Sequence, residues 1–118
     1  MQLDLYAVAR TILLWRIRFV IGYKDIKRQV IHCLKKGLVS HEQRNNIDIK
    51  NLLAIGQVTL EQTADALRRS SGDSYSTSPH HLDPSIDVHI VKTIHAGKNW
   101  YIKWYFVEPN SVFISVHH

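Results

Sequence analysis

Residues 100–106 read Trp-Tyr-Ile-Lys-Trp-Tyr-Phe, and this stretch decides the expected fold. Large apolar side chains occupy its even positions, whereas Tyr, Lys and Tyr occupy positions 101, 103 and 105. Such alternation is typical of a β-strand that has one face in a core and the other face outside it. The pattern predicts that Tyr101, Lys103 and Tyr105 project from the same face.

A further strand is expected on each side of this segment. Residues 87–94 are rich in Val and Ile and are joined to it by a short connection, 95–98, that contains glycine. A turn at 108–111 leads to another alternating segment, 112–117. Because short connections join antiparallel neighbours, residues 87–118 are predicted to form an antiparallel β-meander.

The chain before the meander has a different character. Residues 1–70 are expected to be mainly helical, and residues 71–86, rich in Ser and Pro, are expected to form a loop. Thr59 and Gln62 have the spacing of a capping box. The expected helices cover 25–36, ended by Gly37, then a stretch from Ser40 to Gly56, and then 59–69. The 118 residues are therefore predicted to form one α+β domain, with N-terminal helices packed on a C-terminal antiparallel sheet.

The charge balance indicates an acidic partner. Fifteen Lys and Arg residues against ten acidic residues give a net charge of +5, and eight histidines can add to it. Nucleic acid is the first expectation for a small basic domain, followed by an acidic protein and an anionic membrane surface. The single cysteine, Cys33, excludes a disulfide within the chain and is expected to be a small buried hydrophobe, which fits a reducing, cytoplasmic setting.

The segment Leu3–Tyr23 is apolar enough to need separate consideration. Arginines at positions 10, 16 and 18 interrupt it, so its uncharged runs fall short of the ~20 residues that span a bilayer. A signal peptide is also not expected, since Asp4 precedes the arginines. Its apolar spacing predicts an amphipathic helix that packs on the core or lies on a membrane surface.

Several kinds of site are disfavoured by the motifs. The sequence contains no His-Glu-x-x-His or cysteine pair for zinc, no glycine-rich phosphate loop and no Gly-x-Ser-x-Gly. No metal or cofactor is therefore expected. Residues 59–67 resemble the first helix of a helix-turn-helix unit, but the segment that should read DNA, 74–81, contains Pro79 and few helix-forming residues.

Metal-free RNA cleavage requires no short motif. The 2′-hydroxyl of the substrate attacks the adjacent phosphate, so the protein has to supply a base, an acid and positive charge. On the expected sheet, Tyr101 and His117 are acid–base candidates, Lys103 is a phosphate ligand, and Tyr105 could stack on a base. His89 could stand across from them. The alternative is that this face packs on the helices.

Four fragments resemble bacterial ribonuclease toxins of the RelE and MqsR kind. They are Gly72-Asp73-Ser74-Tyr75-Ser76, Asp87-Val88-His89, Trp100-Tyr101-Ile102-Lys103 and Phe113-Ile114-Ser115-Val116-His117. The resemblance implies the barnase, colicin and RelE-like fold, an RNA substrate and a cognate antitoxin that covers the site. It makes Tyr101 a phosphate or acid–base residue and places the basic group of the last strand at His117 or His118.

Two positions depart from the family pattern. Ser76 stands where the family has a lysine, and Ile86 stands where it has a glutamine. Either another basic residue substitutes, or the chain has kept the fold without the activity. The candidate substitutes are His80, His81, Lys92 and Lys98. The expected function is a metal-independent endoribonuclease toxin, and the alternative is a non-catalytic nucleic-acid-binding regulator or a protein-interaction module such as an inhibitor.

Overall fold

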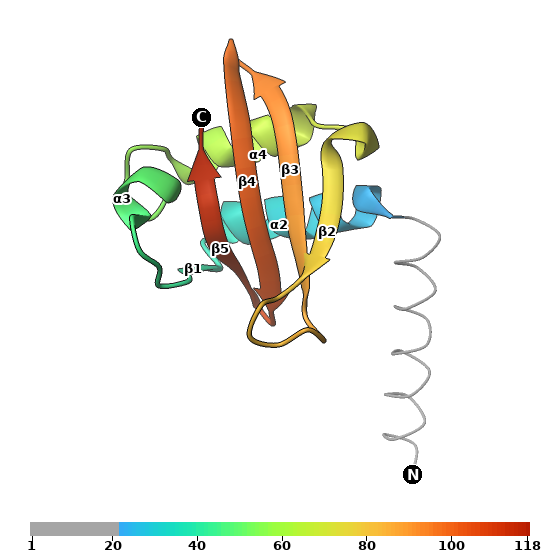
Figure 1. The fold of residues 1–118 in the computed structure, drawn as a ribbon. Coiled ribbons are helices and arrows are strands. Elements are labelled where there is room, and N and C mark those ends of the chain that lie inside the picture. The colour runs from blue at the N-terminus through green and yellow to red at the C-terminus, as the bar shows by residue number, and fades with distance from the viewer. Residues whose placement is uncertain (1–21) are drawn as a thin grey trace.

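A computed structural model describes residues 22–118, which form a five-stranded sheet with helices on one face (Figure 1). The strand order is β1-β5-β4-β3-β2. The bounds of the elements are α2 Tyr23–Lys36, β1 Val39–His41, α3 Ile47–Lys50, α4 Leu60–Arg69, the 3-10 turn η1 Gly72–Ser74, β2 Tyr75–Pro79, β3 Asp87–His95, β4 Lys98–Val107 and β5 Asn110–His117. The α+β prediction is confirmed.

The predicted meander is present as β3, β4 and β5, paired antiparallel in chain order. Its first connection is tight because Ala96 and Gly97 both have positive φ, at 52° and 73°, as two-residue hairpin turns require. On β4 the expected alternation holds: Trp100, Ile102 and Trp104 are buried, whereas Tyr101 is only half-buried.

The buried face of the sheet packs on α2 and α4. α2 ends as the sequence indicates, at Gly37 with a φ of 71°, but it begins at Tyr23, two residues before the expected start at Asp25. The capping box of Thr59 and Gln62 starts α4 as expected. The core between helices and sheet contains Val30, Leu34, Ala64, Leu67, Val91, Ile102, Trp104, Phe113 and Val116. The opposite face of the sheet, which we call the open face, is not covered by α2 or α4 (Figure 1).

Two strands were not expected. Tyr75–Pro79, within the predicted loop 71–86, pairs antiparallel with β3; its Ser and Thr side chains suit a strand at the sheet's margin, and Pro79 ends it. Val39–His41 pairs parallel with β5. The sheet is therefore mixed rather than purely antiparallel. The predicted helix from Ser40 to Gly56 is wrong apart from the single turn α3.

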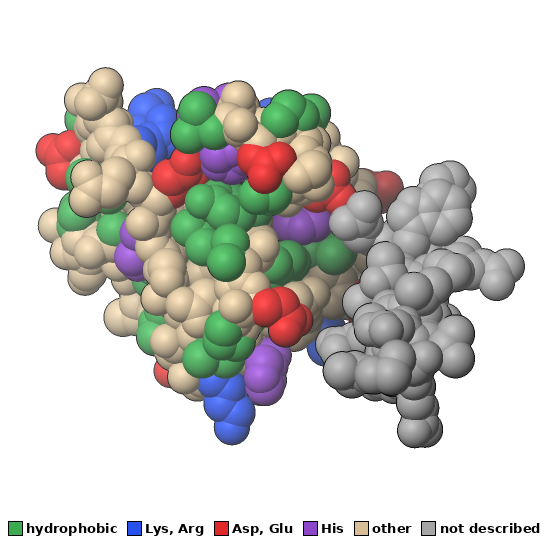
Figure 2. All heavy atoms as spheres, turned by 90° about the horizontal axis from the view of Figure 1, so that it is seen from below, with side chains coloured by type: hydrophobic (Ala, Val, Ile, Leu, Met, Phe, Trp, Pro, Cys, Tyr) green, Lys and Arg blue, Asp and Glu red, His purple; other side chains and the backbone are tan. Residues whose placement is uncertain are grey.

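Figure 2 shows the end of the molecule with the β2–β3 loop and the β4–β5 turn. Hydrophobic side chains gather in the centre of this view with acidic and histidine side chains beside them, and Lys and Arg side chains lie toward its margins. Across residues 22–118, no helix is long and apolar enough to cross a membrane. The amphipathic helix expected at Leu3–Tyr23 lies almost wholly outside these residues, so that prediction stays untested.

Candidate active site on the open face

A row of three side chains crosses the upper part of the open face. Lys92, Tyr101 and His117 are in register on β3, β4 and β5. The rings of Tyr101 and His117 are stacked, with centroids 5.1 Å apart and planes 14° apart. The Lys92 Nζ lies 5.8 Å from the Tyr101 centroid. An aromatic hydroxyl, an imidazole and an ammonium group therefore share one surface.

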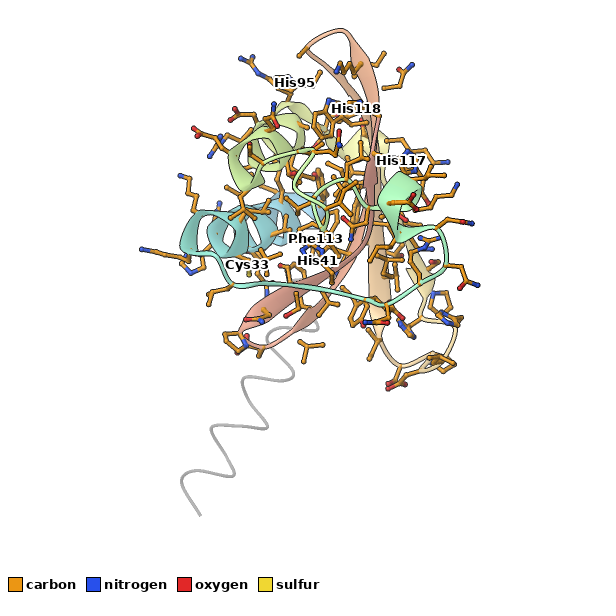
Figure 3. All side chains as sticks on the ribbon, turned by 90° about the vertical axis from the view of Figure 1, so that its left-hand side faces the viewer. Cys33, His41, His95, Phe113, His117 and His118 are labelled. Carbon is orange, nitrogen blue, oxygen red and sulfur yellow. The ribbon has the colours of Figure 1, made fainter. Side chains whose placement is uncertain are left out.

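Figure 3, which views the sheet along its edge, separates the two faces of β5. His117 lies on the side away from α2 and α4, whereas Phe113 and Cys33 lie on the helix side. Cys33 is 3% exposed, as expected for a core residue. The predicted site face is thus accessible from the side opposite the helical layer, and the alternative that these two helices cover it is wrong.

The loop between β1 and α3 brings positive charge to this row. The Nη1 of Arg44 donates to the Ser115 Oγ at 2.6 Å and to the Ile114 oxygen at 3.3 Å. These two residues form a bulge, because the register with β4 shifts between them and Phe113. A parallel bridge between Asn51 and Val116 holds the end of α3 against β5. Lys50, the last residue of α3, is therefore near His117.

These charges act on His117. Burial lowers the pKa of its imidazole, and the positive charges of Lys50, Arg44 and His118 lower it further. A lowered pKa leaves the ring neutral at pH 7, where it can accept a proton. His117 therefore has the protonation state of a general base.

Two other predicted residues also project from the open face. Lys103 stands opposite Ser115, below the row. Tyr105 stands opposite Val112, at the lower end. Burial raises the pKa of the Tyr105 hydroxyl, and the neighbouring Glu42 carboxylate raises it further. Tyr105 thus keeps its hydroxyl proton beside Glu42. The expectation that it stacks on a base stays a prediction.

His80 and His81 lie beside Tyr105. The His80 ring meets Tyr105 edge-on at 4.9 Å and stacks on His81 at 4.8 Å. Tyr105 is four residues from Tyr101 along β4, which corresponds to about 13 Å in a strand. His80 is therefore out of reach of an atom held between Tyr101 and His117.

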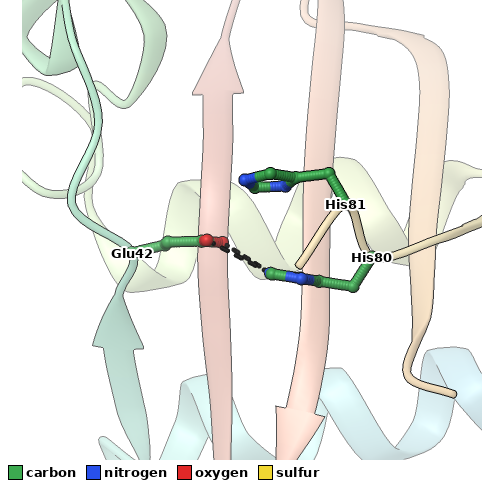
Figure 4. Close-up of side chains that lie close together, drawn as sticks. All are labelled: Glu42, His80 and His81. Carbon is green, nitrogen blue, oxygen red and sulfur yellow. Dashed lines mark hydrogen bonds and ion pairs between the residues drawn. The ribbon is translucent and has the colours of Figure 1, made fainter. Parts of the chain in front are cut away.

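Both nitrogens of His80 are engaged within the protein. Its Nδ1 accepts the backbone N–H groups of Leu82 at 3.1 Å and Asp83 at 3.3 Å. In the neutral ring the proton is consequently on Nε2, which donates to Glu42 at 3.1 Å. His80 is 6% exposed and joins the β2–β3 loop to the residues after β1 (Figure 4).

This arrangement does not fit a metal ion. Glu42, His80 and His81 bring one potential ligand atom each to within 4.8 Å of one another. A metal on the Nε2 of His80 would need the proton on Nδ1 instead, where two backbone N–H groups already point. Stacked imidazoles also direct their in-plane lone pairs alongside one another, not toward a common centre.

Two candidates are not part of the open face. His89 is 3% exposed and stands opposite Trp104, with its Nδ1 2.8 Å from the Tyr75 hydroxyl. The expectation that His89 stands across from Tyr101 and Lys103 is wrong, because the register places it on the helix side. Lys98 pairs with His95 at the hairpin end and, by alternation, shares the face of Trp100.

Arg44 and Lys50 are functional candidates that sequence reasoning missed. Both precede His117 by more than 60 residues, and nothing in their local sequence connects them with it. The parallel pairing of β1 with β5 is what brings them together, and a parallel pair leaves no hairpin signal. No protein-family model and no curated protein sequence matches the chain.

Proposed function

We propose that the protein is a metal-independent endoribonuclease of the toxin kind. The observation that carries the proposal is the row of Lys92, Tyr101 and His117 in register on the open face. Arg44 and Lys50 add positive charge at one end of the row. A base, a hydroxyl donor and cations are the groups that cleavage by the 2′-hydroxyl requires.

In the proposed reaction the His117 imidazole removes the proton of a ribose 2′-hydroxyl, and the 2′-oxygen forms a bond to the adjacent phosphorus. The bond from phosphorus to the 5′-oxygen of the next nucleotide breaks. The Tyr101 hydroxyl donates its proton to that leaving oxygen. The phenolate then regains a proton and the His117 imidazolium releases one, both by exchange with solvent water. The products are a 2′,3′-cyclic phosphate and a 5′-hydroxyl.

The cations have a separate role in this scheme. Charge accumulates on the phosphate oxygens as the new bond forms, and fixed positive groups stabilise it. Lys92 lies on the Tyr101 side of the row, and Arg44 and Lys50 lie on the His117 side. These three residues take the place of the lysine that Ser76 replaces, in preference to His80, His81 and Lys98.

The proposed function implies two partners. RNA is the substrate, and a cognate antitoxin with an acidic surface would cover the basic open face in the cytoplasm. The same face would serve a non-catalytic nucleic-acid-binding regulator, because stacking on tyrosine and phosphate neutralisation do not need His117. The role of His117 therefore decides between the two functions.

Expression in growing cells tests the proposal. The unaltered chain should arrest growth and fragment cellular RNA, and His117→Ala or Tyr101→Phe should relieve both effects. His32→Ala is the matched control, since His32 is exposed on α2 and should leave the arrest unchanged. Circular dichroism and thermal melting establish that the variants fold. Unimpaired growth with intact RNA on expression of the unaltered chain would reject the enzyme.

A further inference from the structure

A cavity of about 430 Å³ lies on the open face below the row. Its sides are the residues after β1 and the β2–β3 loop, and its floor is the lower part of the sheet. Its lining residues include Glu42, Arg44, His81, Leu82, Lys103 and Ile114. Its volume is within the range of small-ligand sites. We call it the loop cavity.

The loop cavity adjoins the proposed active site through two cations. Lys103 is two residues from Tyr101 on β4, so both side chains project from the same face about 7 Å apart. Arg44 lines the cavity and also donates to Ser115, two residues before His117. A chain of nucleotides with one phosphate at the row would therefore extend its next nucleotide over Lys103 and into the cavity.

One wall of the loop cavity is the aromatic ring of His81. His81 stacks on His80, whose own ring is fixed by Glu42 and by the backbone N–H groups of Leu82 and Asp83. In Figure 4 the His81 ring lies on the side of His80 toward which β5 runs. Its free face is therefore directed along the sheet, toward the end of β5 that carries His117.

The remaining walls combine apolar surface with hydrogen-bond donors. Ile114 and Leu82 are apolar, and Leu82 is 77% exposed. The side chains of Arg44 and Lys103 carry hydrogen-bond donors and no acceptor groups. The Glu42 carboxylate accepts from His80 and is next to the Tyr105 hydroxyl, so its oxygens are engaged within the wall. A flat aromatic ligand whose edge carries acceptor atoms satisfies these walls, and nucleobases have both properties.

We propose that the loop cavity binds one nucleobase of single-stranded RNA, on the nucleotide next to the phosphate held by Tyr101 and His117. The base stacks on the free face of His81, and its carbonyl or ring-nitrogen acceptors face Lys103 and Arg44. This inference rests on the proposed function for the position of the phosphate. It gives His81 a role in binding the base, whereas the sequence analysis offered His81 as a basic substitute for the family's lysine.

The test uses five-nucleotide single strands with one central ribonucleotide, in which the base of either neighbouring nucleotide is removed while its phosphate is kept. For binding, the central 2′-hydroxyl is methylated so that no cleavage can occur. One of the two neighbouring nucleotides places its base in the loop cavity. Removing that base should weaken binding roughly tenfold, the effect of losing one stacked base. His81→Ala should weaken binding of the intact strand by the same factor, and His81→Tyr should restore it.

The two changes should not add. If the base stacks on His81, removing the base from the strand weakens binding to the His81→Ala variant less than binding to the unaltered protein. His32→Ala, an exposed histidine on α2, should bind the intact strand like the unaltered protein. Additive effects, or equal binding of intact and base-free strands by the unaltered protein, would overturn the inference.

Failure of this inference is distinguishable from failure of the proposed function. Base-dependent binding of the methylated strand, without cleavage of the unmethylated one, would reject the enzyme and keep the subsite. Cleavage at the central ribonucleotide at a rate indifferent to both neighbouring bases would reject the subsite and keep the enzyme.

Discussion

The rings of Tyr101 and His117 lie on adjacent strands, in register, with centroids 5.1 Å apart and planes 14° apart. Both side chains project from the open face of the sheet. Each residue extends from a paired strand, and the bulge beside His117 is held by Arg44. Groups on paired strands are held more firmly than groups on loops, which favours the alignment that proton transfer needs.

Lys50→Met should raise the pKa of His117. Removing the Lys50 charge removes one of the causes that lower this pKa, while burial and Arg44 remain. The pKa should move up toward the ordinary histidine value of 6.5, and NMR titration of the ring measures it directly. The acidic limb of the cleavage rate should move to higher pH by the same amount.

Lys24→Met is the control for this change. It removes the same charge from an exposed position on α2, on the far side of the sheet. The His117 titration should not respond to it. Equal shifts from both variants would show that net charge, and not the position of Lys50, sets the pKa.

His80→Leu should loosen the β2–β3 loop but should not alter the proton transfers by Tyr101 and His117. The ring accepts the N–H groups of Leu82 and Asp83, and leucine offers them no acceptor. Amide hydrogen exchange at these two residues should accelerate by roughly tenfold or more. His81→Leu leaves those hydrogen bonds in place and is the matched control. Unchanged exchange in the His80 variant would contradict the assigned role.

Asn51→Leu should be strongly destabilising. Asn51 is fully buried; its Nδ2 is 3.0 Å from His41 Nδ1, and its Oδ1 accepts from the Ala54 N–H at 3.0 Å. Leucine leaves these partners unsatisfied, at a cost of about 2–4 kcal/mol in the free energy of unfolding. Asn45→Leu, at an exposed position, should change it by less than about 0.5 kcal/mol. Urea unfolding of both variants measures the difference, and equal values would refute the role of Asn51.

Tyr23→Phe should alter stability at alkaline pH. Burial raises the pKa of Tyr23 from 10.0 to about 12, partly offset by its hydrogen bond to Ser70. Because the folded state holds this proton more tightly than the unfolded state, the stabilisation is complete below pH 10 and is lost as the pH rises toward 12. The variant should lose less stability than the unaltered protein between pH 10 and 12. Parallel losses would contradict the assignment.

The sequence predicted those parts of the fold that local patterns encode. The alternation around Ile102, the capping box at Thr59 and the glycine ending α2 each depend on neighbours a few residues apart, and each is present. β1 and β2 were missed because their pairing is supplied from elsewhere in the chain. A short polar strand at a sheet margin has almost no signature of its own.

In the candidate site, too, the features encoded by neighbouring residues were predicted and those that depend on distant segments were missed. Tyr101 and Lys103 share a face because both lie on one strand, so alternation was sufficient to predict it. Placing His89 required the register between β3 and β4, which the sequence left open, and the structure assigns it to the helix side. Arg44 and Lys50 reach His117 through the parallel pairing of β1, a contact between distant segments.

We propose that His117 and Tyr101 cleave RNA through the attack of its own 2′-hydroxyl. The most direct test is incubation of the purified protein, in excess EDTA, with a DNA strand that contains one ribonucleotide. We expect cleavage only at the bond 3′ to that ribonucleotide, with 2′,3′-cyclic phosphate and 5′-hydroxyl ends identified by mass spectrometry. His117→Ala should be slower by about a hundredfold or more. A strand of the same sequence without the ribonucleotide is the control. The proposal is contradicted if the ribonucleotide-containing strand stays intact, if the control strand is cleaved, or if His117→Ala cleaves at an undiminished rate.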